Sequence, residues 1–367
     1  MFFKLTSIAT ILSMLVGAML TCTQIRPYDT EGRDQVENVI LLIGDGMGEN
    51  HLNWTKEAKG VDLVMETFPL RGQSKTKSAN SPITDSAAGG TALSSGIRTG
   101  NNYVGVYFAD PLQTYATPSN ITEICESHGM RTGVVTTDLI TGATPSAFSA
   151  HTNDRGNNDK IIAQQMASDI DILWGNTDEY FDKATAEANG FTVVDSEAEM
   201  DALENGSKSF AAFDSALWKN ETGTDDPTLS EMTEKAIEIL DNDDEGFFLM
   251  VEGAHIDKHS HSNDEESMMT ALLEFDKAIE KALEFAKADG NTLVVVTADH
   301  ETGYIQKSSG EYRYFIGNHS AENVPLFVYG STNFIDNGEA VKNYMVPRLI
   351  AASLGFEQSE FRNVQAD

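Results

Sequence analysis

Residues 292–299 read TLVVVTAD, a short apolar run that ends on an acidic residue. Three further runs have strand length and a similar composition: NVILLIG at 38–44, TGVVTT at 132–137 and FFLMVEG at 247–253. Runs that are apolar on both faces are typical of parallel strands covered by helices. The four runs therefore predict a parallel sheet at the centre of the molecule.

Helical spacing of apolar residues recurs at about 120–129, 159–168, 229–242, 264–287 and 338–353. Strands that alternate with helices predict an α/β fold, with a doubly wound, mostly parallel central sheet flanked by helices on both faces. The range 171–225 is more acidic and less periodic. There we expect extra short strands and an acidic surface excursion, and no separate domain.

The N-terminal stretch MFFKLTSIATILSMLVGAMLTC predicts a secretory signal over residues 1–22. One lysine precedes an apolar run from about Leu5 to Leu20, which is short for a membrane span. We therefore expect a secreted or periplasmic protein. The alternative is a lipoprotein signal ending at Cys22, which would make the chain an outer-membrane lipoprotein. With Cys125 as the second cysteine, no disulfide framework is implied.

The chain is strongly acidic. Among 367 residues, 25 Lys and Arg stand against 57 Asp and Glu, which gives a formal net charge of −32. Nucleic-acid partners need a basic surface that neutralises phosphates, and this composition supplies none. The same argument excludes an anionic membrane surface as the main partner.

Metal-type ligands gather where the predicted strands end. The ends of parallel strands share one edge of a sheet, so these side chains should lie close together. Carboxylates mixed with imidazoles suit zinc, and hard oxygen ligands suit magnesium. The set predicts a polynuclear metal site, and its members are Asp45, Glu252, Asp257, His261, Asp299 and His300.

The stretch TDSAAGGTALSSG at 84–96 has two readings: Ser86 is either a nucleophile or a residue in the cap of a short helix. A bound divalent cation could lower the pKa of a serine hydroxyl, and a helix N-terminus adds positive potential. Gly89 and Gly90 inside this helix predict the close approach of a neighbouring backbone.

Taken together, GDGMG, TDSAAGGTA, ATPSAFSAHTNDR, VEGAHIDKHSH, TADH and NHS resemble the motif series of alkaline phosphatases, in order from about residue 36 to 355. The resemblance implies one catalytic domain over 36–355 and hydrolysis of phosphate monoesters through a phosphoseryl intermediate. It also implies small phosphate-ester substrates of broad range and a homodimer.

The resemblance further implies roles for individual residues. Ser86 would be the nucleophile, and Arg155 would clamp the phosphoryl oxygens. One zinc ion would be held by Asp45, Asp299 and His300, and the other by Asp257, His261 and His319. A magnesium ion would be held by Asp45, Thr144 and Glu252. Asp85 would cap the helix and pair with Arg155.

The sequence departs from the family at Gly142, where relatives usually carry Asp or His two residues before the threonine ligand. We therefore expect a weak or altered magnesium site. Asp138 could serve instead only if the chain folds back toward the site. Lys258 either binds phosphate as a point charge or is a solvated lysine. His255 and His259 are expected to be bystanders.

Two other functions stay open at this point. One is a phosphodiesterase or another phosphoryl-transfer enzyme of the same superfamily, which a comparison of monoester and diester hydrolysis would distinguish. The other is a non-catalytic metal- or phosphate-binding protein. Such a protein would show no turnover, whether or not Ser86 is replaced.

Overall fold

A computed structural model describes residues 33–108, 115–213, 226–241 and 245–361. The predicted signal over 1–22, with Cys22, lies outside these residues. No helix in the described ranges combines the length and the apolar character needed to cross a bilayer.

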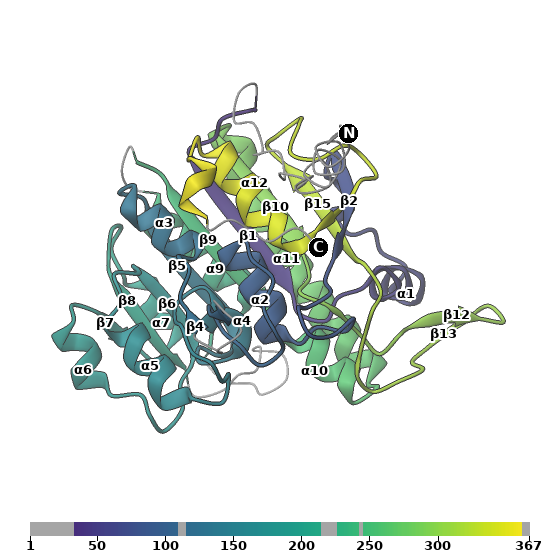
Figure 1. Cartoon of the computed structure of the whole chain (residues 1–367), viewed down its shortest axis with the longest axis horizontal. Helices are drawn as coiled ribbons and strands as arrows, with labels where there is room; N and C mark the ends of the chain where they lie inside the picture. Colours follow the sequence, from purple (N-terminus) through teal and green to yellow (C-terminus); the bar gives the residue numbers. More distant parts are fainter. Residues whose placement is uncertain (1–32, 109–114, 214–225, 242–244, 362–367) are drawn as a thin grey trace, which may run out of the picture.

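A large mixed sheet forms the centre of the described molecule (Figure 1). Its strand order is β16-β2-β15-β10-β1-β9-β5-β6-β8-β7. The strands are β1 (Asn38–Gly44), β2 (Leu70–Lys75), β5 (Arg131–Leu139), β6 (Ile172–Asn176), β7 (Thr192–Val194), β8 (Ser209–Phe213), β9 (Phe247–Gly253), β10 (Thr292–Thr297), β15 (Val324–Tyr329) and β16 (Ala340–Lys342).

The four runs predicted as strands are adjacent and parallel. β1 pairs with β10 on one side and β9 on the other, and β9 pairs with β5. The antiparallel pairs are β10 with β15 and β15 with β2. The predicted doubly wound, mostly parallel sheet is therefore confirmed.

Helices cover both faces of the sheet (Figure 1). Along β1, Ile40 and Leu42 join one buried cluster, and Leu41 and Ile43 join a second cluster on the opposite face. This alternation follows from the two-residue period of a strand. The helices are α1 (Glu49–Lys59), α2 (Ser86–Ser95), α3 (Ile121–Ser127), α4 (Ala143–Ala147), α5 (Asn158–Met166), α6 (Lys183–Ala188), α7 (Glu197–Asp201), α9 (Leu229–Leu240), α10 (His255–His261), α11 (Glu265–Asp289) and α12 (Val346–Ser353).

Short elements complete the described chain. Three small hairpin-like pairs are β3 (Tyr107–Phe108) with β4 (Tyr115–Ala116), β11 (Glu301–Thr302) with β14 (His319–Ser320), and β12 (Gln306–Ser308) with β13 (Glu311–Arg313). The 3-10 turns are η1 (Val64–Thr67), η2 (Asn343–Met345) and η3 (Gln358–Glu360).

The prediction of a helix over 338–353 is wrong in its first half. Ala340–Lys342 pairs parallel with β2 as an edge strand, and α12 begins only at Val346. Pro347 lies in the first turn of α12, where its missing N–H leaves no hydrogen bond unmade. That proline was the sequence signal for the later helix start.

The described part of the range 171–225, residues 171–213, contains the expected short strands, and residues 214–225 lie outside the described chain. β6, β8 and β7 continue the central sheet beyond β5, and all three pair in parallel. Trp174 in β6 is fully buried, and its Nε1 donates to Ser209 Oγ at 3.0 Å. Within 171–213 the acidic residues lie in the helices and loops that connect the strands.

Candidate active site

Acidic residues and histidines meet at the carboxyl edge of the central strands. The β1 register pairs Ile43 with both Glu252 and Thr297, so Asp45, Glu252 and Asp299 follow or end neighbouring strands at similar heights. The Asp45 N–H donates to Gly253 O at 3.2 Å, and the Gly46 N–H donates to Asp299 Oδ1 at 3.2 Å. These backbone contacts tie the three strand ends together.

Asp257, His261 and His319 bring their ligand atoms within 4.8 Å of one another. His261 follows Asp257 by one helical turn on α10, and its Nε2 lies 3.3 Å from Asp257 Oδ2. Nδ1 of His261 contacts Gly317 O and Nδ1 of His319 contacts Thr84 O, both at 2.9 Å. These backbone contacts leave each Nε2 facing the group, which is the arrangement typical of metal-binding imidazoles.

Asp45, Asp257 and His300 form a second group of the same tightness. His300 Nε2 lies 3.4 Å from Asp45 Oδ1 and 3.2 Å from Asp299 Oδ2. The sequence-based set for this ion was Asp45, Asp299 and His300. The structure adds Asp257 to that neighbourhood, so the two groups adjoin through its carboxylate.

Ser86 is the first residue of α2 and is 5% exposed. Its Oγ lies 3.1 Å from His300 Nε2. Asp85 is the N-cap of the helix and accepts a hydrogen bond from Ala88 N at 3.0 Å. The serine therefore lies at a helix N-terminus and also faces the second ligand group, so the two sequence readings are compatible.

Arg155 reaches the same place from the loop before α5 (Asn158–Met166). Its Nη1 lies 3.4 Å from Asp85 Oδ2, as expected from the sequence. Its backbone N–H donates to Asn102 O at 3.0 Å, which fixes the start of the side chain. The partly exposed guanidinium therefore lies next to the cap of the helix that Ser86 begins, and its charge acts on Asp45 and His300.

Thr144 lies on α4 and Glu252 near the end of β9, where the charge of Glu252 acts on Asp45. Thr144 is on α4, which packs closely against α2: a Cβ at Gly90 would lie 3.3 Å from the Thr144 Cα. Glu252 is buried in β9 and accepts a hydrogen bond from Thr136 Oγ1. The role of Asp45, Thr144 and Glu252 in holding magnesium stays a prediction.

The buried acids at this edge hold their protons tightly in the absence of cations. Burial and the charges of neighbouring acids raise the pKa of Asp45 well above its usual value. Burial raises the pKa of Glu252 to about 8 and that of Asp299 to about 7. Burial also lowers the pKa of His300. Such groups favour cations that would replace the protons.

The pKa values of His261 and Asp257 shift the other way, because these two side chains form a hydrogen bond with each other. The hydrogen bond to Asp257 raises the pKa of His261 to about 9. Burial acts to raise the pKa of Asp257, but its hydrogen bond with His261 and the nearby His300 outweigh burial and lower it. Asp257 is therefore ready to serve as an anionic ligand.

Unsatisfied buried atoms test whether metal ions fit this site. Among the described residues, Asp45 Oδ1, Thr144 Oγ1 and Asp299 Oδ2 are buried without a hydrogen-bond partner. Buried polar atoms are rarely left unpaired, and all three are oxygen atoms of the type that binds divalent cations. The donor set and these orphaned oxygens fit bound metal ions.

The sequence matches the family model described as Alkaline phosphatase over residues 36–190 and 210–345. The chain belongs to the alkaline phosphatase family. Alkaline phosphatase 3 of Bacillus subtilis strain 168 is 36% identical over 307 residues, covering 77% of this chain and 65% of that protein. Alkaline phosphatase 4 of the same strain is 31% identical over 377 residues, covering 96% of this chain and 79% of that protein.

A solved structure supports the same assignment. A variant of the TAB5 alkaline phosphatase, with Mg bound in its M3 site, superposes with a TM-score of 0.78 at 32% identity, covering 89% of this chain and 99% of that one. TAB5 is an Antarctic bacterium. The predicted family, fold and enzyme class are confirmed by these matches.

Some residues of this alkaline phosphatase-family site were missed from sequence. Thr302 Oγ1 donates to Asp257 Oδ1 and lies 3.2 Å from His300 Nδ1, so one hydroxyl contacts both ligand groups. Thr136 holds Glu252. Isolated threonines carry no motif, and these contacts depend on segments that are distant in sequence.

The remaining candidates lie around the magnesium end. Lys258 forms an ion pair with Asp138, and the lysine side chain is 44% exposed. His255 Nδ1 lies 3.0 Å from Thr137 Oγ1. Neither His255 nor His259 belongs to the two ligand groups of the described chain.

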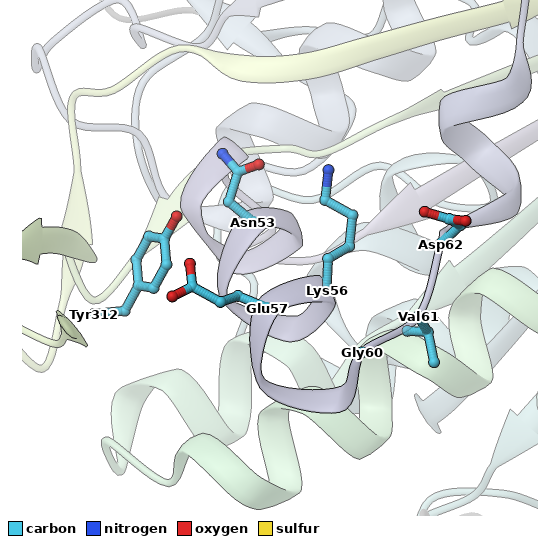
Figure 2. A pocket seen from close by; sticks show the side chains of 7 residues that line it. All are labelled: Asn53, Lys56, Glu57, Gly60, Val61, Asp62 and Tyr312. Atoms are coloured by element: carbon cyan, nitrogen blue, oxygen red, sulfur yellow. The ribbon is translucent and has the colours of Figure 1, made fainter. Parts of the chain in front are cut away.

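A surface pocket of about 490 Å³ lies elsewhere, between α1 and β13 (Figure 2). It is lined by Asn53, Lys56, Glu57, Gly60, Val61, Asp62 and Tyr312. Lys56 is already paired with Glu66 at 2.7 Å, and Glu57 is paired with Lys307. No predicted site residue lines this pocket, so it does not compete with the strand-end site.

Proposed function

We propose that the chain hydrolyses phosphate monoesters to an alcohol and inorganic phosphate through a covalent phosphoseryl intermediate at a site with two zinc ions and one magnesium ion. The observation that carries this proposal is the contact of Ser86 Oγ with His300 Nε2 at 3.1 Å, inside the cluster of candidate ligands. Without candidate metal ligands beside it, Ser86 would be interpreted only as a residue of the helix cap.

We assign the candidate ligands to three metal ions as the family resemblance implies. Asp45, Asp299 and His300 would hold one zinc ion; Asp257, His261 and His319 the other; and Asp45, Thr144 and Glu252 the magnesium ion. When bound, these cations would lower the pKa values of the serine hydroxyl and of water and would neutralise developing charge. The relative with Mg bound in its M3 site supports a third metal position.

The chain's own groups account for binding and orientation. Arg155, held by Asp85, would bind two phosphoryl oxygens in a fork, and Lys258 would add a point charge. Ser86 Oγ would form a bond to phosphorus as the bond to the alcohol oxygen breaks. Water would then release inorganic phosphate from the serine. With three divalent ions and Arg155 against four ligand carboxylates, the pocket would carry a formal surplus of about three positive charges despite the acidic surface.

Replacement of Ser86 tests this mechanism. We expect Ser86→Ala to lower kcat for an aryl phosphate monoester by more than about 1000-fold while the zinc content is retained. Mass spectrometry after acid quenching should find phosphate on Ser86 in the unsubstituted enzyme. Ser94→Ala, at the other end of α2, removes a buried hydroxyl far from the cluster and is the matched control.

Three results would contradict the proposal. Unchanged turnover in Ser86→Ala would remove Ser86 from the mechanism. A clear preference for a diester over a monoester would favour a phosphodiesterase. A zinc-loaded protein without turnover of either ester would favour a non-catalytic binding protein.

We infer export and assembly from the N-terminal pattern and the family resemblance. The N-terminal pattern supports a secreted or periplasmic location, with lipidation of Cys22 as the outer-membrane variant. The family resemblance supports a homodimer. Mass spectrometry of the mature N-terminus and light scattering would test the two.

A further inference from the structure

A bulge interrupts β5 just before the site. β5 and β6 pair in register from Gly133 to Val135 and again only at Leu139, opposite Asn176. Residues 136–138 therefore face a single residue of β6, Gly175. A Cβ at Gly175 would lie 2.7 Å from Thr136 Cγ2 and 2.9 Å from Asp138 O, closer than real contacts allow. The glycine makes room for the bulge, and bulges commonly redirect side chains near active sites.

The bulge directs three consecutive side chains toward one neighbour, the segment from β9 to α10. Thr136 Oγ1 donates to Glu252, and Thr137 Oγ1 accepts from Ala254 N at 3.1 Å. Asp138 pairs with Lys258. In a regular strand Thr136 and Asp138 would share one face and Thr137 would point to the other, so the contacts of all three with one segment depend on the bulge.

The bulge also brings Asp138 to the position that Gly142 leaves without a side chain. A Cβ at Gly142 would lie 3.6 Å from Asp138 Oδ2. It would also lie 2.8 Å from Leu139 O, which already accepts a hydrogen bond from Gly142 N at 2.7 Å.

We propose that Asp138 is a positioning residue for the magnesium end of the site, where it supplies the outer carboxylate that Gly142 lacks and holds Lys258. The inference rests on the proposed function for the existence of that metal site. Asp138 would act on a hard cation held by Thr144 and Glu252 without ligating it, by accepting hydrogen bonds from the cation's water shell and by its negative charge. Outer carboxylates of this kind commonly change metal affinity 10- to 100-fold.

The test is a calorimetric titration of Mg²⁺ into the zinc-loaded, full-length protein. We expect Asp138→Asn, which keeps the shape of the side chain, to raise the Mg²⁺ dissociation constant about 10- to 100-fold and to leave the zinc content unchanged. Asp138→Glu should recover part of the affinity. Glu66→Gln removes an equally shielded carboxylate from a lysine pair remote from the site and should match the unsubstituted protein.

Lys258→Met separates the proposed role from simple loss of an ion pair. It breaks the same pair but leaves the Asp138 charge, so we expect Mg²⁺ affinity to be equal to or tighter than that of the unsubstituted protein. Weakening by Lys258→Met as large as that by Asp138→Asn would overturn the proposal. So would an unchanged constant in Asp138→Asn, or an unsubstituted protein that binds no Mg²⁺. Because the titration needs no turnover, a failure of monoester hydrolysis would be seen separately.

Discussion

At the residue scale, the carboxylate of Asp85 links the helix of Ser86, the proposed nucleophile, to Arg155, the proposed phosphate clamp. Oδ1 accepts from Ala88 N in the first turn of α2, and Oδ2 accepts from Asn102 N at 2.9 Å and from Arg155 at 3.4 Å. The helix that carries Ser86 and the arginine beside it are therefore held by one side chain.

Arg155→Lys keeps the charge of the clamp but removes the fork. We expect kcat/KM for a phosphate monoester to fall about 10- to 100-fold and inhibition by inorganic phosphate to weaken in parallel, because an ammonium cannot bind two oxygens in the plane of a guanidinium. Steady-state kinetics would measure both. Arg131→Lys is the control. Arg131 is the first residue of β5, at the end of the strand away from the site, and it pairs with Asp171 at 2.7 Å. Equal losses in the two variants would contradict the fork.

At the element scale, the packing of α3 on β5 encloses an acidic side chain. Glu126 is partly buried at the end of α3, where it accepts from Thr132 Oγ1 at 3.0 Å. Burial and the nearby charges of Asp169 and Glu123 raise the pKa of Glu126 to about 7. The folded protein thus binds this proton more tightly than the unfolded chain does, whose value is near 4.5.

It follows that ionisation of Glu126 costs stability as the pH rises from about 4.5 to 7. We expect Glu126→Gln, which can still accept from Thr132, to become more stable relative to the unsubstituted protein as the pH is raised from 5 to 8, by about 1 kcal/mol once solvent screening is allowed for. Urea unfolding midpoints at the two pH values would measure this. A trend of opposite sign in Glu126→Gln would refute the expectation.

At the scale of the whole molecule, the strand-end acids connect metal binding to stability. Glu252, with a pKa of about 8, and Asp299, with a pKa of about 7, gain protons on folding when no cation is bound. Without metal the folded state therefore loses stability as the pH rises through the range from about 4 to 8. Bound cations remove this penalty, because they stabilise the ionised carboxylates.

Chelation should accordingly lower the melting temperature, on the order of 10 °C for tightly bound ions, and the loss should be larger at pH 9 than at pH 6. At pH 6 both carboxyls are largely protonated in the metal-free protein, so less repulsion is exposed. Calorimetry with and without a chelator, followed by restoration with zinc, would measure the difference. A melting temperature that the chelator leaves unchanged at both pH values would argue against a structural metal cluster.

The sequence by itself determined the central strands and the types of the candidate metal ligands, because each lies in a contiguous run of residues. A buried parallel strand is apolar along its length, and the residue after it lies at the sheet edge in whatever order the strands pair. The sequence also predicted that a neighbouring backbone approaches the glycines of α2. A Cβ at Gly89 would lie 2.9 Å from Asp299 O, as that close approach requires. Asp45, Ser86 and His300 could thus be proposed together before any pairing was known.

Tertiary structure alone decided the contacts that join segments more than a hundred residues apart. Asp138 pairs with Lys258 of α10 from within a bulge that Gly175 accommodates, and the partner lies 120 residues further along the chain. Ala340–Lys342 became a strand because β2 offered an open edge. Neither a bulge nor an edge pairing leaves a periodic signal within its own segment, since both depend on backbone groups supplied by another part of the chain.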